Sequence, residues 1–395
     1  VTLRGAVSVT NATTFANTGS LQLGGVESDN LYFAGGLVAT APSAITMAGV
    51  LHNNNSGITL GNAGSTIDLL EMTDINSGSG SLNVLSPVTA NAYRLRLLST
   101  GPTTWDRDLT STAALRFAGP VTFSNPATLS AASFDFVSSV TFGGATTVTA
   151  STVTFGGSVT AAGDLTVNGA TVVNGTGVNS GSYTQTYNGA VTVGRLATDT
   201  TTFTGVGMTF GSTLDGTSRV MVADSGNTTY TGAIGGTTAP AHFETDATGT
   251  STFKGGLLRT SSPNSILIAD NAVVTTDTTF DTTNNGALAA GANITFNKTL
   301  NSDAVAARAV TLNAGTSGLV LVSGAVGNTN PLSTLTLTQS NGATFAAPVV
   351  TTTSVVLSNT VAGQTIRFAD NLTTPALMST SNGYNLELLG GSTSV

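Results

Sequence analysis

The chain has 395 residues, of which 40% are apolar, only 8% are charged and 47 are glycine. This is enough apolar material for a core, so a disordered low-complexity chain is excluded and the surface must be covered largely by neutral hydroxyl and amide side chains. Twelve basic residues against twenty acidic ones give a net charge of −8, which excludes a basic surface for nucleic acid or for anionic lipid head groups.

The absence of cysteine removes several kinds of chemistry from consideration. Disulfides, thiol nucleophiles and cysteine-based metal sites are excluded. A cysteine-free, lysine-poor chain rich in Thr, Asn and Gly fits bacterial export in an unfolded state, because a premature disulfide would obstruct passage. We therefore expect an extracellular location.

The N-terminal part, residues 1–114, already begins as a strand with "VTLRGAVSVT". It lacks the basic and apolar regions of a signal peptide, and no run in the chain approaches the about 18 apolar residues that a membrane helix needs. We predict irregular solenoid coils for residues 1–114, regular solenoid repeats for residues 115–395, and no membrane insertion.

The densest charged patch lies near the end of this first part. It comprises Trp105, Asp106, Arg107 and Asp108, with Arg94 and Arg96 shortly before them. An aromatic residue beside two carboxylates is typical of a sugar-binding or general acid/base site. The alternative, which we prefer, is an irregular loop that leaves the solenoid with its Asp and Arg side chains in solvent.

A repeat of nineteen residues follows directly. Three successive segments, 117–135, 136–154 and 155–173, align without a gap. Their apolar positions fall into four columns: Phe117, Phe136 and Phe155; Val121, Val140 and Val159; Leu129, Val148 and Val167; and Phe134, Val153 and Val172. Periods of 20 to 50 residues indicate a solenoid or an array.

The core of this repeat is an aromatic residue followed four positions later by Val, Leu or Ile, which we call the kernel. Successive kernels are separated by 19, 19, 23, 20, 23 and 23 residues where the series is unbroken. Beyond the three aligned segments, it recurs at Phe33/Leu37, Tyr187/Val191, Phe210/Leu214, Tyr230/Ile234, Phe253/Leu257, Phe296/Leu300, Phe345/Val349 and Phe368/Leu372.

Within each repeat the apolar residues alternate with Thr, as in Val153-Thr-Phe155, and Gly, Asn, Asp or Pro interrupt the runs. This is the pattern of short strands joined by tight turns, and we find no amphipathic stretch of helical length. We therefore predict an all-β, right-handed parallel β-helix with coils of 19–23 residues, the hand following from the preference of crossover connections. Each column then stacks on itself about 4.8 Å above. A propeller would need longer blade repeats, and Ig-like sandwiches would need larger units.

Polar residues outside the charged patch have structural interpretations. His52 and His242 belong to no metal-spaced pair, and Gly35-Gly36, Gly143-Gly144 and Gly255-Gly256 lack the lysine of a phosphate-binding loop. We interpret Asp199, Asp215, Asp224 and Asp246 as turn formers. The threonine runs 200–202 and 351–353 drift in register, which argues against an ice-binding array. Asn-x-Thr sequences occur at Asn11, Asn174, Asn227, Asn293, Asn297 and Asn371, as expected of this composition. We predict no catalytic, metal or cofactor-binding residue and no cofactor.

With its repeats aligned, the chain resembles the shafts of filamentous-haemagglutinin-like adhesins and autotransporter passengers. The segments that carry the likeness are Thr184–Val193 (TQTYNGAVTV), Thr229–Pro240 (TYTGAIGGTTAP), Gly327–Val349 (GNTNPLSTLTLTQSNGATFAAPV) and Ala362–Leu372 (AGQTIRFADNL). The likeness covers most of residues 115–395 and only loosely residues 1–114. It implies a right-handed β-helix shaft and a role as a surface adhesin, fibre or biofilm component.

These observations together predict a structural or adhesive β-solenoid at the bacterial cell surface that is not an enzyme. The alternative is a carbohydrate-active β-helix enzyme, a polysaccharide lyase or hydrolase. Neither "VTLRGAVSVT" nor the final "YNLELLGGSTSV" contains a capping element, so we expect a longer chain or end-to-end self-association. Glycans of host or neighbouring-cell surfaces are the other expected partners, and nucleic acid is not.

Overall fold

The computed structural model describes residues 1–261 and 265–394, and these two ranges contain strands and no helix. Parallel strands stack about 21 residues apart and form a β-solenoid of about 18 turns, which confirms the predicted fold class. The right-handed winding stays a prediction. Across the same two ranges no helix is long and apolar enough to cross a membrane. The chain divides into two compact units, Val1–Gln185 and Thr186–Val395, and strand β24 (Gln185–Tyr187) contains the boundary.

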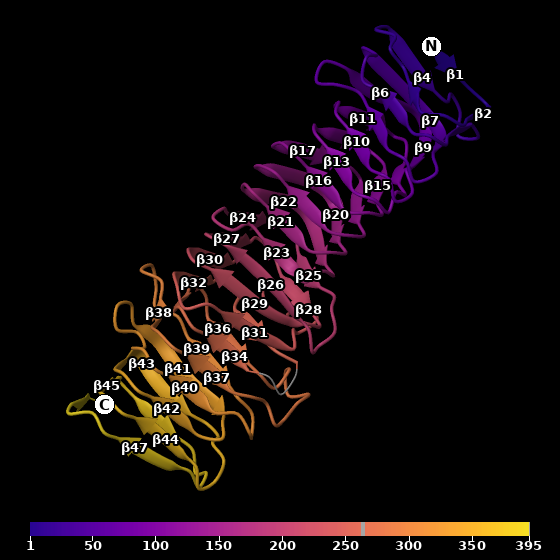
Figure 1. The fold of residues 1–395 in the computed structure, drawn as a ribbon. Helices are drawn as coiled ribbons and strands as arrows, with labels where there is room; N and C mark the ends of the chain where they lie inside the picture. Colours follow the sequence, from indigo (N-terminus) through magenta and orange to yellow (C-terminus); the bar gives the residue numbers. More distant parts are fainter. Residues whose placement is uncertain (262–264, 395) are drawn as a thin grey trace. The chain divides into compact units, whose positions relative to one another are not determined.

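Each coil of the first unit contributes to three stacks of parallel strands (Figure 1). Stack 1 contains β1 (Thr2–Leu3), β4 (Ser20–Leu23), β11 (Val88–Asn91), β14 (Leu109–Ser111) and β17 (Ala127–Ser130). Stack 2 contains β2 (Ala6–Val9), β5 (Asn30–Phe33), β12 (Leu95–Leu97), β15 (Ala114–Phe117) and β18 (Ser133–Phe136). Four long strands serve both stacks: β7 (Ala44–His52), β9 (Thr66–Asn76), β20 (Thr146–Phe155) and β22 (Leu165–Val173). Stack 3 contains β3 (Thr13–Thr14), β6 (Leu37–Ala39), β8 (Ile58–Leu60), β10 (Leu82–Val84), β13 (Thr103–Trp105), β16 (Val121–Phe123), β19 (Val140–Phe142), β21 (Val159–Ala161) and β23 (Gly177–Asn179).

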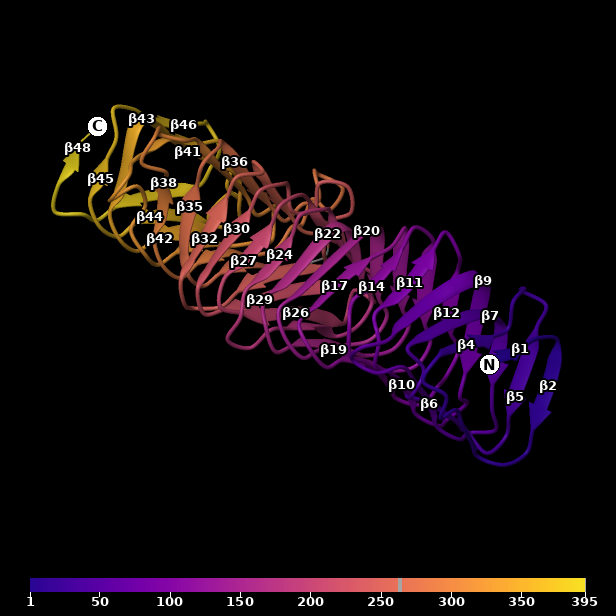
Figure 2. The same cartoon turned by 90° about the horizontal axis from the view of Figure 1, so that it is seen from above.

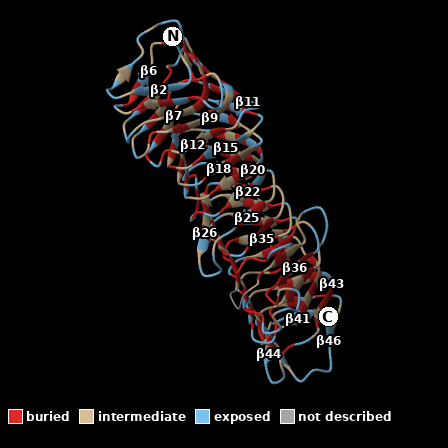
Figure 3. Cartoon of the chain, turned by 90° about the vertical axis from the view of Figure 1, so that its right-hand side faces the viewer, coloured by how far each residue is buried: buried red, intermediate tan, exposed pale blue. Residues whose placement is uncertain are grey.

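The predicted phenylalanine column exists in stack 2. Phe117 pairs with Phe136, which pairs with Phe155, and all three side chains are buried. Their rings stack with centroids 5.1 Å and 5.7 Å apart. Toward the N-terminus the same register continues with aliphatic residues in place of aromatic ones, namely Leu97, Ile75, Leu51, Leu31 and Val7. Inward-facing side chains thus stack through successive coils, with buried residues inside the strands and exposed ones on the projecting loops (Figure 3).

The columns that begin at Val121 and Leu129 are confirmed. The column that begins at Phe134 is wrong at its last member, Val172. Val153 pairs with Thr171, which is buried, and Val172 is only half-buried. The cause is a β-bulge, because two residues of β20, Ala150 and Ser151, lie opposite the single Gly169 of β22. After the bulge, each residue of β22 therefore pairs one position earlier than an exact repeat of nineteen residues predicts.

The second unit also has three stacks (Figure 2). Stack 4 contains β27 (Met208–Phe210), β30 (Asn227–Tyr230), β32 (Thr250–Phe253), β35 (Asn271–Val274), β38 (Leu300–Ser302), the first half of β43 (Val349–Leu357), β45 (Leu372–Thr373) and β48 (Thr393–Ser394). Stack 5 contains β25 (Val191–Val193), β28 (Leu214–Gly216), β33 (Leu257–Arg259), β36 (Thr278–Asp281), β39 (Val310–Asn313), β41 (Leu332–Gln339), the second half of β43, and β46 (Leu377–Ser379). Stack 6 contains β26 (Thr200–Gly205), β29 (Arg219–Asp224), β31 (His242–Thr245), β34 (Ile266–Ile268), β37 (Ile294–Phe296), β40 (Val320–Val322), β42 (Ala343–Phe345), β44 (Thr365–Phe368) and β47 (Asn385–Leu388).

The kernels of the second unit do not form a single column. Phe210, Tyr230 and Phe253 stack in stack 4 with ring centroids 5.4 Å and 5.2 Å apart. Phe345 and Phe368, by contrast, stack in stack 6 with centroids 4.8 Å apart. The kernel joins two inward-facing positions across a tight turn, so it fits any corner of a coil, and sequence spacing alone does not distinguish the corners.

One kernel is also displaced by a residue. Ile234 pairs with Leu258, which is fully buried, rather than with the predicted Leu257. Gly255 and Gly256 lengthen this turn, and Gly256 has a φ of +71°. The predicted turn role of this glycine pair is thereby confirmed.

The threonine runs are divided between core and surface. Thr201 is buried with its Oγ1 3.0 Å from Ser218 Oγ, and Thr351 Oγ1 donates to Thr374 Oγ1 at 2.7 Å. Their neighbours Thr200 and Thr352 are exposed. Buried hydroxyl groups thus pair across successive coils, and these runs offer no flat array of exposed threonines.

Candidate functional site

Trp105 of the predicted charged patch is a core residue. It lies in β13 between Val84 and Phe123 of the neighbouring strands and is 1% exposed. Its indole ring contacts Phe117 edge to face, with centroids 5.9 Å apart. The ring is therefore not available to stack on a sugar.

The charged residues that follow Trp105 contact the next coil. Asp106 accepts a hydrogen bond from Asn125 Nδ2 at 2.5 Å, and the carboxylate of Asp108 accepts one from the backbone N–H of Thr128 at 2.7 Å. Arg107 lies 3.8 Å from Asp106. Two of these three side chains therefore connect adjacent coils, rather than projecting freely as predicted for a loop.

Asp108 also lines an open groove of about 390 Å³ on the outside of stack 1. The groove crosses β17, β20 and β22, and its lining is Asp108, Pro126, Ala127, Thr128, Ala145, Thr146, Thr147, Asp164 and Thr166. Asp164 accepts hydrogen bonds from the backbone N–H and the hydroxyl of Thr184, both at 2.9 Å. These hydrogen bonds lower the pKa of Asp164, so its carboxyl group is ionised at neutral pH.

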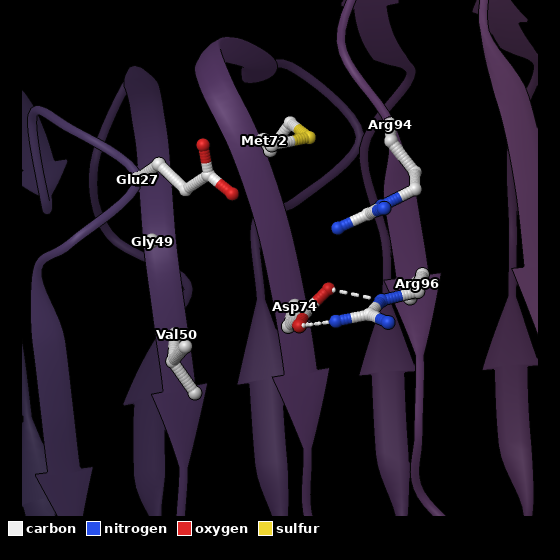
Figure 4. Close-up of a pocket in the computed structure, with 7 residues that line it drawn as sticks. All are labelled: Glu27, Gly49, Val50, Met72, Asp74, Arg94 and Arg96. Carbon is white, nitrogen blue, oxygen red and sulfur yellow. Dashed lines mark hydrogen bonds and ion pairs between the residues drawn. The ribbon is translucent and has the colours of Figure 1, made fainter.

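Arg94 and Arg96 belong to another part of the coil, at β12 in stack 2. Arg96 pairs in register with Asp74 of β9 and forms a bidentate ion pair with it, including a hydrogen bond from Nε to Oδ1 at 2.7 Å (Figure 4). The hydrogen bond to Asp74 raises the pKa of the Arg96 guanidinium. The predicted patch is thus two separate groups of residues.

Arg94 and Arg96 line a shallow pocket of about 80 Å³, which we call the Arg94 pocket. Its lining is Glu27, Gly49, Val50, Met72, Asp74, Arg94 and Arg96. A bulge of β9 forms one wall, because Leu70, Glu71 and Met72 lie opposite the single residue Ala48 of β7. Nothing in the sequence pattern singled out Glu27 or Met72, since loop and bulge bring them to Arg94 from distant positions.

The remaining sequence-predicted residues lie apart from one another. His52 contacts the Tyr32 ring at 4.9 Å and Asn30 Oδ1 at 2.7 Å, and His242 lies 3.2 Å from Glu244. In residues 1–261 and 265–394 there is no group of three or more His, Asp or Glu residues arranged to hold a metal ion.

The four aspartates that we interpreted as turn formers each have a local partner. Asp199 forms an ion pair with Arg195 at 3.2 Å and Asp246 accepts from Thr248 Oγ1 at 2.7 Å. The other two lie within strands rather than in turns, yet each accepts at least one hydrogen bond from a backbone N–H of a neighbouring bend. Asp215 accepts from the N–H groups of Thr237 and Thr238, and Asp224 accepts from Gly226 N and Thr228 Oγ1.

Sequence reasoning missed the buried carboxyl group of Asp270 in the second unit. Asp270 is 3% exposed and accepts hydrogen bonds from Thr245 Oγ1 and Ser251 Oγ, both at 2.8 Å. Desolvation raises its pKa to about 6. The buried ring of Tyr230 lies nearby, and burial together with the charge of Asp270 raises the pKa of its phenol. No spacing or composition signal distinguishes Asp270 from the surface aspartates.

The fold defines the class of protein as a parallel β-solenoid. No protein-family model matches the chain, and no curated protein and no solved structure shows significant similarity to it.

Proposed function

We propose that this chain is an extracellular structural or adhesive β-solenoid, a stiff segment of a bacterial surface shaft or filament. The observation that carries the proposal is that aspartate side chains form hydrogen bonds with the backbone of the next coil. Asp108, Asp164 and Asp277 each accept a hydrogen bond from a backbone N–H one coil further along, at 2.7 Å, 2.9 Å and 2.8 Å. Carboxylates of this kind hold adjacent coils together.

Interior packing supports the same role. Each coil buries its inward face only against its neighbours, so the array stays ordered as long as the stacks are unbroken. The hydrogen bonds of parallel strands pair backbone groups along each unit, which limits access for proteases. A chain outside the cell, without chaperones, benefits from both properties. Proposed partners are further coils of the same kind and glycans of host or neighbouring cells.

Surface display in the source bacterium tests this proposal. We expect antibody against the chain to label intact cells, and we expect a deletion strain to lose attachment or biofilm mass that the parent gene restores. Labelling only after the cells are broken, together with unchanged attachment in the deletion strain, would overturn it.

One observation favours a second candidate, a carbohydrate-active enzyme. The groove of stack 1 contains two carboxylates, Asp108 and Asp164, on an open polar surface. A glycosidase also needs a general acid whose pKa is raised, whereas the pKa of Asp164 is lowered. New reducing or unsaturated ends from a polysaccharide panel, abolished by Asp108→Ala or Asp164→Ala, would favour the enzyme over the shaft.

A further inference from the structure

The Arg94 pocket contains two side chains of opposite charge, Arg94 and Glu27, that form no side-chain hydrogen bond or ion pair in the part of the chain that the structure describes, although the charge of Glu27 acts on Arg96. Neither Arg94 nor the carboxylate of Glu27 forms a hydrogen bond or an ion pair through its side chain within residues 1–261 and 265–394, and Arg94 Nε is buried without an acceptor. Figure 4 shows the two side chains pointing toward one another from either side of Met72. A buried, unpaired donor of this kind has a cost to folding that a ligand would remove.

The residues around these two groups either have other partners or have no room for a side chain. The carboxylate of Asp74 forms its bidentate ion pair with Arg96, so it does not pair with Arg94. Gly49 has a φ of +80°, and a Cβ there would lie 2.3 Å from the carbonyl oxygen of Asp29, so the backbone at this position cannot take a side chain without moving. Glu71 is engaged by the backbone N–H of Glu27 at 2.7 Å.

The charges define what the pocket accepts. Glu27 and Asp74 carry two negative charges and Arg94 and Arg96 two positive ones, so the lining is balanced. A lone anion on Arg94 would face Glu27, and a lone cation on Glu27 would face Arg94. A volume of about 80 Å³ equals on the order of three water molecules at about 30 Å³ each. A ligand that fills it is small and carries both signs.

We propose that the Arg94 pocket binds the head group of a free α-amino acid. The carboxylate of the ligand pairs with the planar guanidinium of Arg94, a geometry suited to two parallel hydrogen bonds. Its ammonium group donates to the Glu27 carboxylate, and the α-carbon lies over the Met72 thioether. The side chain of the amino acid extends outward, because the pocket is open to solvent. This site is independent of the proposed structural role.

Calorimetric titration of the full chain with three matched probes tests the proposal. Glycine carries both charges, N-acetylglycine only the carboxylate and glycinamide only the ammonium group. We expect glycine to bind at one site with a dissociation constant on the order of millimolar, and each of the other two at least about tenfold more weakly, since one charge-assisted hydrogen bond is lost. No binding of glycine, or equal binding of N-acetylglycine, would overturn the proposal.

Variants locate the site. Arg94→Gln and Glu27→Gln should each weaken glycine binding at least about tenfold. Arg116→Gln is the matched control, because Arg116 follows Arg96 in the same outward column but pairs with Asp135 outside the pocket. Binding that is unchanged in both pocket variants, or weakened equally in the control, would contradict the assignment.

A measurement on the unaltered protein covers the case in which a variant fails to fold. Methyl-labelled methionine gives one resonance for each of the five methionines. Glycine should shift the Met72 methyl resonance and leave that of Met378, which is 53% exposed in the second unit, unchanged. An unshifted Met72 resonance at a glycine concentration that saturates the calorimetric signal would place binding elsewhere and overturn the proposal.

Discussion

Phe117 and Phe136 lie directly opposite one another on β15 and β18, and their rings stack with centroids 5.1 Å apart. Phe136 also stacks on Phe155 at 5.7 Å and contacts Phe123 of stack 3 edge to face at 6.2 Å. One side chain thus connects three successive coils and two stacks. Positions of this kind, rather than local propensity, determine whether a solenoid coil is ordered.

Phe136→Ala should therefore loosen three coils at once. Truncating a buried phenylalanine costs about 3–5 kcal/mol, because the cavity removes ring contacts on both sides. Hydrogen exchange followed by mass spectrometry should show faster exchange in the segments 114–117, 133–136 and 152–155. Val137→Ala, at a neighbouring position that is 40% exposed, should change stability by less than about 0.5 kcal/mol. Equal effects of the two variants would mean that the phenylalanine column is not a structural core.

The sequence was sufficient to predict the phenylalanine column because the same requirement for an inward-facing apolar residue recurs in every coil. Residues that face the interior at the same point of each coil must be apolar, so Phe117, Phe136 and Phe155 recur at a constant spacing. The same reasoning located the paired valines of β16, β19 and β21. It failed at Val172, because a bulge adds a residue to one strand without changing the composition of the next.

The corner of the coil at which each kernel lies, and the Arg94 pocket, could not be predicted from the sequence for a different reason. The kernel of Phe210 turns from stack 4 to stack 5, whereas that of Phe345 turns from stack 6 to stack 4. Both have the same residue types at the same spacing, so nothing local separates them. The pocket depends on loop and bulge residues, Glu27 and Met72, whose positions follow from packing rather than from the repeat.

Asp270 should make the second unit more stable as the pH falls toward 4. Desolvation raises the pKa of this carboxyl group in the folded chain from 3.8 to about 6, so the folded state binds the proton more tightly than the unfolded state does. The stabilising effect is complete below about pH 3.8 and is lost as the pH rises through about 6. The difference corresponds to about 3 kcal/mol. Urea unfolding at several pH values between 4.5 and 7.5 should show about 2 kcal/mol of this difference, because the effect is still incomplete at pH 4.5.

Asp270→Asn should remove this dependence, because the amide cannot ionise. Asp246→Asn is the matched control: Asp246 lies close enough to affect Asp270 electrostatically but bonds to Thr248 at the surface. Its variant should retain most of the pH dependence. Below about pH 4 the trend reverses in all variants, because the hydrogen bond from the Ala306 backbone N–H lowers the pKa of Asp303 in the same unit, and this stabilising interaction is lost on protonation. A flat profile in the parent protein would show that Asp270 is not desolvated.

Gly169→Ala should disrupt the bulge between β20 and β22. Gly169 has a φ of +141°, and a Cβ there would lie 1.8 Å from the carbonyl oxygen of Ala150, so the backbone must move. We expect a loss of about 3 kcal/mol, at the upper end of the cost of overpacking. Thermal unfolding and the exchange rate of residues 146–155 report it. Gly19→Ala is the control, since a Cβ at Gly19 meets nothing within 4 Å and its φ is outside the left-handed region. A Gly169 variant as stable as the Gly19 variant would contradict the bulge geometry.

Asp164→Ala should release the backbone of the next coil without any effect on catalysis. The Thr184 N–H and hydroxyl lose their acceptor, so the Thr184 amide should exchange faster with solvent. Because hydrogen bonding lowers the pKa of Asp164, the parent protein should lose the same protection as the pH falls below about 4. Asp106→Ala removes an acceptor that serves the Asn125 side chain amide, so no comparable backbone amide should change. Slow exchange of Thr184 in the Asp164 variant, combined with loss of a polysaccharide-cleaving activity present in the parent, would show that the carboxylate serves chemistry rather than the connection between coils.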